Sequence, residues 1–184
     1  SGLQAPTSGS VTINDNQTVK AGDMGVIFQN YYLFEWRTVQ QSLLLAAQKN
    51  TALKGKEADM IDHYAKEFQL KDELKKYPQQ LSGGQRQRAS IMQQLLKGSD
   101  FLLLDEPFSG LDVCVLDKVT ELLLQVSVSD ELKTLIIVSH DIVTSVAISD
   151  TVIIMGNEAG KPGATIKNEI DLIARDLAWK KDIK

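Results

Sequence analysis

Two consecutive carboxylates follow a short apolar run in the second half of the chain. Residues 101–104 are Phe-Leu-Leu-Leu, and Asp105 and Glu106 come directly after them. Continuous apolar runs of this length are typical of strands buried on both faces of a parallel sheet, and ligands bind beyond the carboxyl ends of such strands. Two acids in that place suit a magnesium ion and an activated water. The competing interpretation is a solvated turn after a strand.

A glycine pair lies upstream of these acids, in Leu81-Ser82-Gly83-Gly84-Gln85, where a helix is predicted to begin. Glycine lets the backbone approach a ligand closely, and a helix N-terminus presents free N–H groups and the positive end of the helix dipole. Ser82 adds a hydroxyl donor. These features predict an anion site, although a lone Ser-Gly-Gly is usually an ordinary helix N-cap.

The elements that must position these residues alternate along the chain. Strands are expected at residues 11–13, 24–28, 101–104, 134–138 and 151–155, the last three buried on both faces. Helices are expected at residues 115–126 and 142–148, between the later strands. Alternating strands and helices favour an α/β fold with a parallel sheet.

Residues 39–98 interrupt this alternation because they are almost purely helical. Helical periodicity or start signals occur at residues 38–48, 56–70 and 82–97, and Gly98 is expected to end the last helix. We therefore expect residues 1–38 and 99–184 to form one sheet domain and residues 39–98 to form a helical insertion into it.

Composition limits the possible classes of function. The chain has 184 residues, 43% of them apolar, which suits one globular domain with a core of its own. The formal net charge of −4 argues against nucleic acid as a main partner. The single cysteine, Cys114, cannot form an internal disulfide, which favours a reducing compartment. No apolar run reaches the ~18 residues of a membrane span, so we expect any membrane connection to run through a partner.

Five motifs, in the same order, resemble those of the ATP-binding subunits of ABC transporters. They are the Q-loop Ile27-Phe28-Gln29, the signature Leu81-Ser82-Gly83-Gly84-Gln85, the Walker B strand at residues 101–105 with Glu106 after it, the D-loop Ser109-Gly110-Leu111-Asp112, and the switch segment Val138-Ser139-His140-Asp141. The resemblance covers almost the whole chain. It implies a P-loop NTPase fold of the RecA-like type, with a parallel-sheet core and a helical insertion.

The resemblance also implies roles for residues that would surround ATP and Mg²⁺. Asp105 would hold magnesium, through water, and Gln29 would contact the same ion and sense the transporter. Glu106 would be the general base that polarises the attacking water, as phosphoryl transfer requires. His140 would contact the γ-phosphate and help to hold the transition state.

Another set of roles concerns a second subunit. Ser82, Gly83 and Gly84, with Gln85 in the same motif, would close over ATP that is held by a second copy of the chain. Asp112 would help to couple the two nucleotide sites of that homodimer. A membrane permease would be the other partner, which would place the subunit at the cytoplasmic face of the cell membrane.

One departure from the family is large. ABC proteins bind ATP mainly through a Gly-x-x-x-x-Gly-Lys-[Ser/Thr] loop between a strand and a helix, and these 184 residues contain no such motif. The upstream aromatic residue that stacks on adenine is absent as well. We therefore expect the chain to begin after that loop, with the N-terminal part of the core missing, and this polypeptide alone to neither bind nor hydrolyse ATP.

Two segments of the chain resemble one branch of the ABC family. Residues 32–39 and 168–179 resemble segments of nitrate, sulfonate and taurine importers, in which the helical insert receives a coupling helix of the membrane subunit. A non-transport ABC ATPase acting on nucleic acid or translation is one alternative, disfavoured by the acidic balance and the uninterrupted helical insert. An inert or interaction-only fragment is the other.

Overall fold

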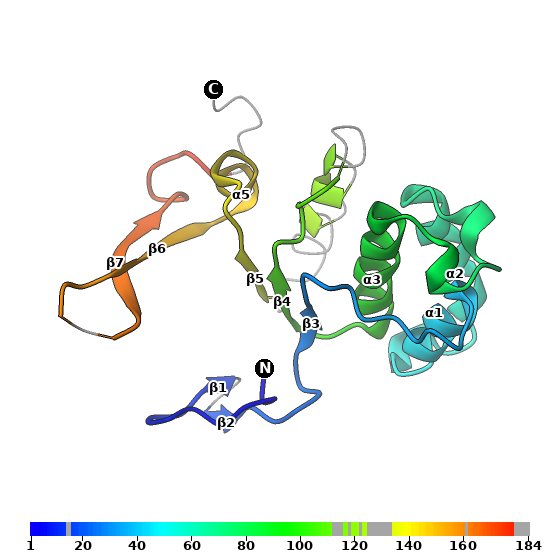
Figure 1. Cartoon of the computed structure of the whole chain (residues 1–184), viewed down its shortest axis with the longest axis horizontal. Coiled ribbons are helices and arrows are strands. Elements are labelled where there is room, and N and C mark those ends of the chain that lie inside the picture. Colours follow the sequence, from blue (N-terminus) through cyan, green and yellow to red (C-terminus); the bar gives the residue numbers. More distant parts are fainter. Residues whose placement is uncertain are drawn as a thin grey trace. The chain divides into compact units, whose positions relative to one another are not determined.

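The computed structural model describes residues 1–13, 16–111, 116, 117, 119–121, 123, 124, 134–160 and 162–178 (Figure 1). The chain divides into two compact units, Ser1–Ser139 and His140–Lys184. The helix predicted at residues 115–126 lies mostly outside the described residues. No helix in the described part of the chain is long and apolar enough to cross a membrane.

Three parallel strands form the sheet of the first unit. They are β3 (Gly25–Ile27), β4 (Phe101–Asp105) and β5 (Thr134–Val138), hydrogen-bonded in the order β3-β4-β5. β3 pairs parallel with β4, and β4 pairs parallel with β5, which confirms the predicted α/β class. A small antiparallel hairpin, β1 (Thr12–Ile13) and β2 (Gln17–Thr18), precedes the sheet.

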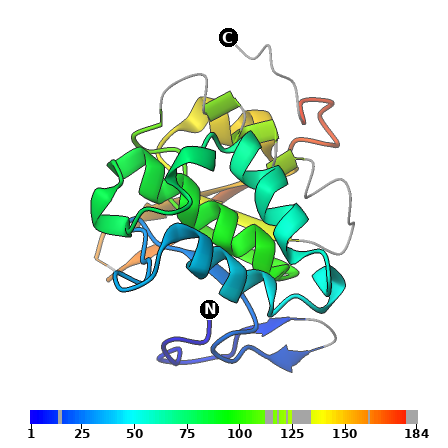
Figure 2. The ribbon, with the colours of Figure 1, turned by 90° about the vertical axis from the view of Figure 1, so that its right-hand side faces the viewer.

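The predicted helices between residues 38 and 98 are all present. They are α1 (Val39–Ala47), α2 (Glu57–Glu67) and α3 (Gly83–Lys97), joined by three short 3-10 helices at Thr51–Leu53, Lys71–Glu73 and Pro78–Gln80. Figure 2 shows the three α-helices, in cyan to green, packed against one another. The side-chain amide of Asn50 donates to the Leu96 carbonyl over 3.2 Å, and this hydrogen bond joins the segment after α1 to the end of α3.

Local sequence explains where these helices begin and end. Thr38 caps α1 through a reciprocal pair of hydrogen bonds with Gln41, and Ser82 caps α3 in the same way with Gln85. Each pair satisfies backbone N–H groups that a helix start would otherwise leave without a partner. Gly98 ends α3 with a φ of +70°, a left-handed conformation that glycine adopts at little cost.

The core of the first unit lies where β4 and the helices meet. Leu102 and Leu104 of β4 are almost completely buried. Gly25 of β3 makes the close approach possible, because a Cβ there would collide with the Leu102 side chain. The helices contribute a buried set of side chains to this core: Val39, Leu43, Ala46, Ala47, Ile61, Ala65, Ala89, Ile91, Met92, Leu95 and Leu96.

β5 departs from the sequence-based prediction. We expected residues 134–138 to be buried on both faces, but Ile136 is 45% exposed and Val138 is 53% exposed. Among the described strands β5 is the last in the order β3-β4-β5 and has only β4 beside it. The four apolar residues after Thr134 therefore predict the strand correctly but not its burial, because burial depends on what lies next to the strand.

The second unit has its own arrangement of α5 (Ile142–Ile148), β6 (Thr151–Asn157) and β7 (Ala164–Asp171). The predicted strand at residues 151–155 is present, but it was expected to be a buried strand of the parallel sheet. It instead pairs antiparallel with β7, and most of its side chains are exposed. Gly160 and Gly163 have φ values of +80° and +83°, and this left-handed backbone turns β7 back onto β6.

Candidate active site

Parallel pairing brings three of the predicted site residues to one edge of the sheet. Ile27 of β3 lies opposite Leu104 of β4, so Gln29 leaves the sheet beside the point where Asp105 and Glu106 do. The carboxyl ends of parallel strands face the same way, and such edges are where ligands bind in α/β folds. Asp105 and Gln29 are exposed, and Glu106 is half-buried.

Glu106 has an unusual backbone conformation at this edge. Its φ is +50°, in the left-handed region that costs a non-glycine residue about 1–2 kcal/mol. Its N–H donates to the Val138 carbonyl of β5 over 2.8 Å, and its own carbonyl accepts from the Ser109 N–H over 3.3 Å. Such strain persists only where neighbouring contacts hold it, and it concentrates at functional sites.

Two side chains that the sequence analysis did not single out as site residues lie near the Glu106 carboxylate. The Ser139 hydroxyl donates to it over 3.4 Å. The phenol of Tyr31 has its pKa raised, first by burial and second by the negative charge of Glu106. Tyr31 also donates to the Ser109 carbonyl over 3.5 Å. Both residues could have been found from their places beside predicted motifs, Tyr31 two positions after Gln29 and Ser139 within the switch segment.

The oxygen donors at this edge are of the kind that bind magnesium. Asp105 offers a carboxylate and Gln29 an amide oxygen, which are the hard oxygen donors that magnesium prefers. Within the described residues, no group of three or more His, Cys, Asp or Glu side chains could hold a metal by itself. Magnesium at phosphate sites takes one or two carboxylates and completes its shell with water and phosphate oxygens, so one carboxylate is enough here.

The N-terminal turn of α3 is the second candidate location. Ser82 and Gly83 are exposed, and nothing lies within 4 Å of a Cβ built on Gly83. The Ser82 hydroxyl accepts from the Gln85 N–H over 3.3 Å. Helix geometry leaves the N–H groups of the first turn without intrahelical acceptors, and only one of them is capped by Ser82. The turn can therefore still present backbone donors to an anion.

Gln85 has a different environment from the other signature residues. Its Oε1 accepts from the Ser82 N–H over 2.9 Å, and its Nε2 donates to Glu73 over 3.0 Å. Glu73 also forms an ion pair with Lys76, with 3.7 Å between the charged atoms. Both polar atoms of Gln85 thus bind within the chain, and in this structure the side chain holds the turn in shape.

Gln87 is a polar residue that the sequence analysis overlooked. Its side chain is only 1% exposed, and its Nε2 donates to the Pro107 carbonyl over 2.6 Å. A signal was present, because Gln87 lies four residues before the fully buried Ile91 and therefore on the same face of α3. This hydrogen bond joins the signature helix to the turn that follows Glu106.

Asp112 and His140 are the remaining predicted site residues. Asp112 lies outside the described residues. His140 is exposed and begins the second unit, and Asp141 after it caps α5 by accepting from the Thr144 N–H over 3.1 Å and from its hydroxyl over 2.7 Å. These two hydrogen bonds are the main reason why the pKa of Asp141 is lowered, with a smaller contribution from the charge of His140.

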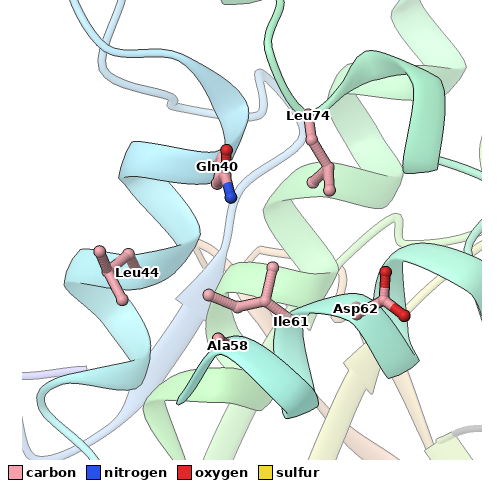
Figure 3. Close-up of a pocket in the computed structure, with 6 residues that line it drawn as sticks. All are labelled: Gln40, Leu44, Ala58, Ile61, Asp62 and Leu74. Carbon is pink, nitrogen blue, oxygen red and sulfur yellow. The ribbon is translucent and has the colours of Figure 1, made fainter.

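A shallow hollow of about 170 Å³ lies within the helical segment (Figure 3). Residues of α1, α2 and the chain after Glu73 line it: Gln40, Leu44, Ala58, Ile61, Asp62 and Leu74. None of them is a predicted site residue.

The segment that leads into α1 exposes two large aromatic side chains, Tyr32 at 69% and Trp36 at 73%.

Comparisons with known proteins all match ATP-binding proteins of transport systems. The family model described as ABC transporter matches residues 1–109. The uncharacterized ABC transporter ATP-binding protein YtlC of Bacillus subtilis is 35% identical over 178 residues, which are 96% of this chain and 66% of that protein. Two proteins of Synechococcus elongatus are similar: the bicarbonate transport ATP-binding protein CmpC (34% identical, 92% of this chain, 26% of that one) and the nitrate import ATP-binding protein NrtD (32%, 94% and 62%).

Solved structures agree with the fold. The ATP-binding cassette MJ0796, solved as a dimer in a post-hydrolysis state with ADP and phosphate, superimposes with a TM-score of 0.74 at 24% identity, covering 92% of this chain and 76% of that one. A second dimeric structure of the same cassette gives a TM-score of 0.75. The chain spans 66% of the length of YtlC and less of the other two relatives.

Proposed function

The chain belongs to the ABC transporter family, and from this premise we propose that it is part of the ATP-hydrolysing subunit of an importer. The observation that carries the proposal is the geometry of the sheet edge. Asp105, Glu106 and Gln29 leave neighbouring parallel strands side by side, and Glu106 is held in a left-handed conformation there. Carboxylates at such an edge suit phosphoryl transfer, in which positioning and charge stabilisation supply most of the catalysis.

In the proposed mechanism Glu106 is the general base that accepts a proton from the attacking water. Ser139 donates a hydrogen bond to its carboxylate and orients it. Asp105, through water, and Gln29 would hold a magnesium ion, which when bound would neutralise charge on the phosphate oxygens. His140, in the switch segment, would contact the γ-phosphate.

A second copy of the chain completes the proposed site. Ser82, Gly83 and Gly84 bind the γ-phosphate of ATP on the partner subunit through the exposed first turn of α3, and Gln85 keeps that turn in shape. Asp112 couples the two sites. The exposure of Ser82 and Gly83 supports this arrangement, and so does the dimeric form in which the cassette MJ0796 was solved.

The proposed membrane partner is a permease that binds the helical insertion, residues 39–98, beside the Q-loop. Phe28, Tyr32 and Trp36 expose aromatic surface next to α1, and exposed aromatic clusters are typical of binding surfaces. The subunit would then lie at the cytoplasmic face of the membrane. The name of NrtD supports an importer of the nitrate, sulfonate and taurine type, whereas the name of CmpC refers to bicarbonate.

We further propose that a polypeptide of these 184 residues alone binds ATP weakly and does not hydrolyse it. The printed sequence contains no Gly-x-x-x-x-Gly-Lys-[Ser/Thr] loop, and in this family that loop supplies most of the contacts to the phosphates. Residues at the sheet edge can polarise water and hold magnesium, but they offer few donors to the nucleotide.

Paired ATP titrations test both proposals. One sample is the chain of 184 residues, and the other, called the loop-extended chain below, carries a strand, a Gly-x-x-x-x-Gly-Lys-Ser loop and a helix before Ser1. We expect calorimetry to detect no submicromolar affinity in the first sample, and to detect magnesium-dependent ATP binding and hydrolysis in the second. Submicromolar affinity in the first would refute the inactivity, and a folded loop-extended dimer without hydrolysis would refute the ATPase assignment.

A further inference from the structure

Gln87 has the smallest exposed fraction, 1%, among the buried polar residues of the described part of the chain. Burying an amide is favourable only when its polar atoms find partners. Its Nε2 donates to the Pro107 carbonyl over 2.6 Å, which spans twenty positions of sequence. The bond therefore connects two separate parts of the molecule, α3 and the turn after β4.

The turn after β4 is the place where the proposed base is held in a strained conformation. Glu106 has its φ of +50° one residue before Pro107. From the sheet side, the Val138 carbonyl binds the Glu106 N–H over 2.8 Å. A left-handed residue needs restraint on both sides to keep its geometry. Gln87 supplies that restraint from the helical side.

A further contact joins the same two parts. A Cβ built on Gly84 would lie 3.8 Å from the Gly110 carbonyl, so the first turn of α3 packs against the loop that follows Glu106. Gly84 belongs to the proposed anion-binding turn, and Gln87 lies less than one helical turn after it. Movement of that turn would therefore be passed to Pro107 through Gln87.

We propose that Gln87 is a positioning residue that couples the first turn of α3 to Glu106. It holds the Glu106–Pro107 backbone in the geometry that the base needs, and it does so only while α3 is in the position seen here. The inference rests on the proposed function for its catalytic consequence, whereas the bracing of the turn stands independently. Displacement of α3 would loosen Glu106 and slow hydrolysis of the ATP held by the same subunit.

Three variants test whether the Gln87 side chain acts through its hydrogen bond to Pro107 or only by filling space in the core. Gln87→Met keeps the length and removes the donor, and Gln87→Asn keeps the amide but is one methylene too short to reach Pro107. The control is Ile91→Val, which removes one methyl group from a fully buried side chain of the same helix. If one of the two Gln87 variants fails to fold, the other supplies the comparison.

The first readout is amide hydrogen exchange in the chain of 184 residues. We expect exchange in residues 106–111 to become about 10-fold faster in the Gln87 variants, relative to exchange in α1 and α2, because a bracing hydrogen bond is lost. Ile91→Val should leave that ratio unchanged. If residues 106–111 exchange alike in the Gln87 variants and in Ile91→Val, the bracing role is wrong.

The second readout is steady-state hydrolysis by the loop-extended chain. We expect kcat to fall about 10- to 100-fold in the Gln87 variants while KM for ATP stays within about twofold, because a misplaced base slows chemistry rather than binding. An unchanged kcat, or an equal loss in Ile91→Val, overturns the coupling to catalysis. If even the unsubstituted loop-extended chain is inactive, the proposed function fails, and the exchange readout still decides the bracing.

Discussion

The carboxyl edge of the sheet and the first turn of α3 both carry candidate site residues, but they are built in different ways. At the sheet edge, Glu106 has a left-handed backbone that is held by the Val138 carbonyl, more than thirty positions away along the chain. At the helix, Ser82 has an ordinary extended backbone, with φ −65° and ψ 164°, closed by Gln85 three residues later.

This difference shows that one part of the proposed site is shaped by residues close in sequence and the other by residues distant in sequence. A capping box forms wherever a serine and a glutamine have the right spacing at a helix start, so the α3 turn needs little from the rest of the molecule. A strained carboxylate at a strand end forms only where neighbouring strands and helices hold it. We therefore expect substitutions in the α3 turn to change stability mainly near that turn, whereas the conformation of Glu106 should depend on contacts with distant segments.

The largest expected effect comes from removing the base at the sheet edge. In the loop-extended chain, Glu106→Gln should lower hydrolysis by about 10²–10⁴-fold and preserve ATP binding, since the amide keeps the shape but accepts no proton. Steady-state assays and calorimetry measure the two quantities. Glu67→Gln, on the exposed end of α2, is the matched control. Turnover within a few-fold of the parent would remove Glu106 from its proposed role.

A smaller loss is expected from blocking the α3 turn. In the loop-extended chain, Ser82→Arg should reduce hydrolysis about 100-fold, because a bulky cation at this turn misplaces the closing surface of the dimer. ATP affinity of the monomer should stay unchanged, since the turn is proposed to act on nucleotide held by the partner. Weaker binding of ATP by the monomer would contradict an action across the dimer.

The backbone strain can be measured as a difference in stability. Both Glu106→Gly and Glu106→Ala remove the carboxylate, but only glycine is free of the left-handed penalty, so the glycine variant should be more stable by about 1 kcal/mol. At Glu67 of α2 the order should be reversed, because glycine destabilises a helix. Denaturant unfolding of the four variants gives these differences, and equal stability of the two Glu106 variants would show that the turn is unstrained.

The smallest expected effect tests the local character of the α3 start. Ser82→Ala should lower the free energy of unfolding by about 1 kcal/mol, and Ser82→Gly by only a few tenths, as for other helix N-caps. Hydrogen exchange should rise most within the first turn of α3, with a smaller rise in residues 106–111 that follows from the bond between Gln87 and Pro107. A rise of equal size in α1 and α2 would mean that the α3 turn depends on the rest of the fold and is not a local cap.

Much of this architecture could be predicted from the residues. The strands at residues 101–105 and 134–138, the helices of residues 39–97 and the parallel pairing follow from apolar runs and helical periodicity. The burial of β5 and β6 was predicted wrongly, since an apolar run shows what a strand can bury but not whether anything covers it. The antiparallel pairing of β6 with β7 was not predicted. Gly160 and Gly163 indicate a turn after β6, but they do not show that the next segment forms a strand or that it pairs with β6.

For this protein, sequence alone determined the features that depend on near neighbours. The helix start at Ser82 and the end of α3 at Gly98 were predicted and are confirmed, and the Thr38 cap of α1 is closed within the same short range. Only the tertiary structure decided the left-handed Glu106, its contact with Ser139 and the bond from Gln87 to Pro107. The reason is physical: a cap is closed within one turn of helix, whereas these contacts join segments that meet only after the sheet and the helices have packed.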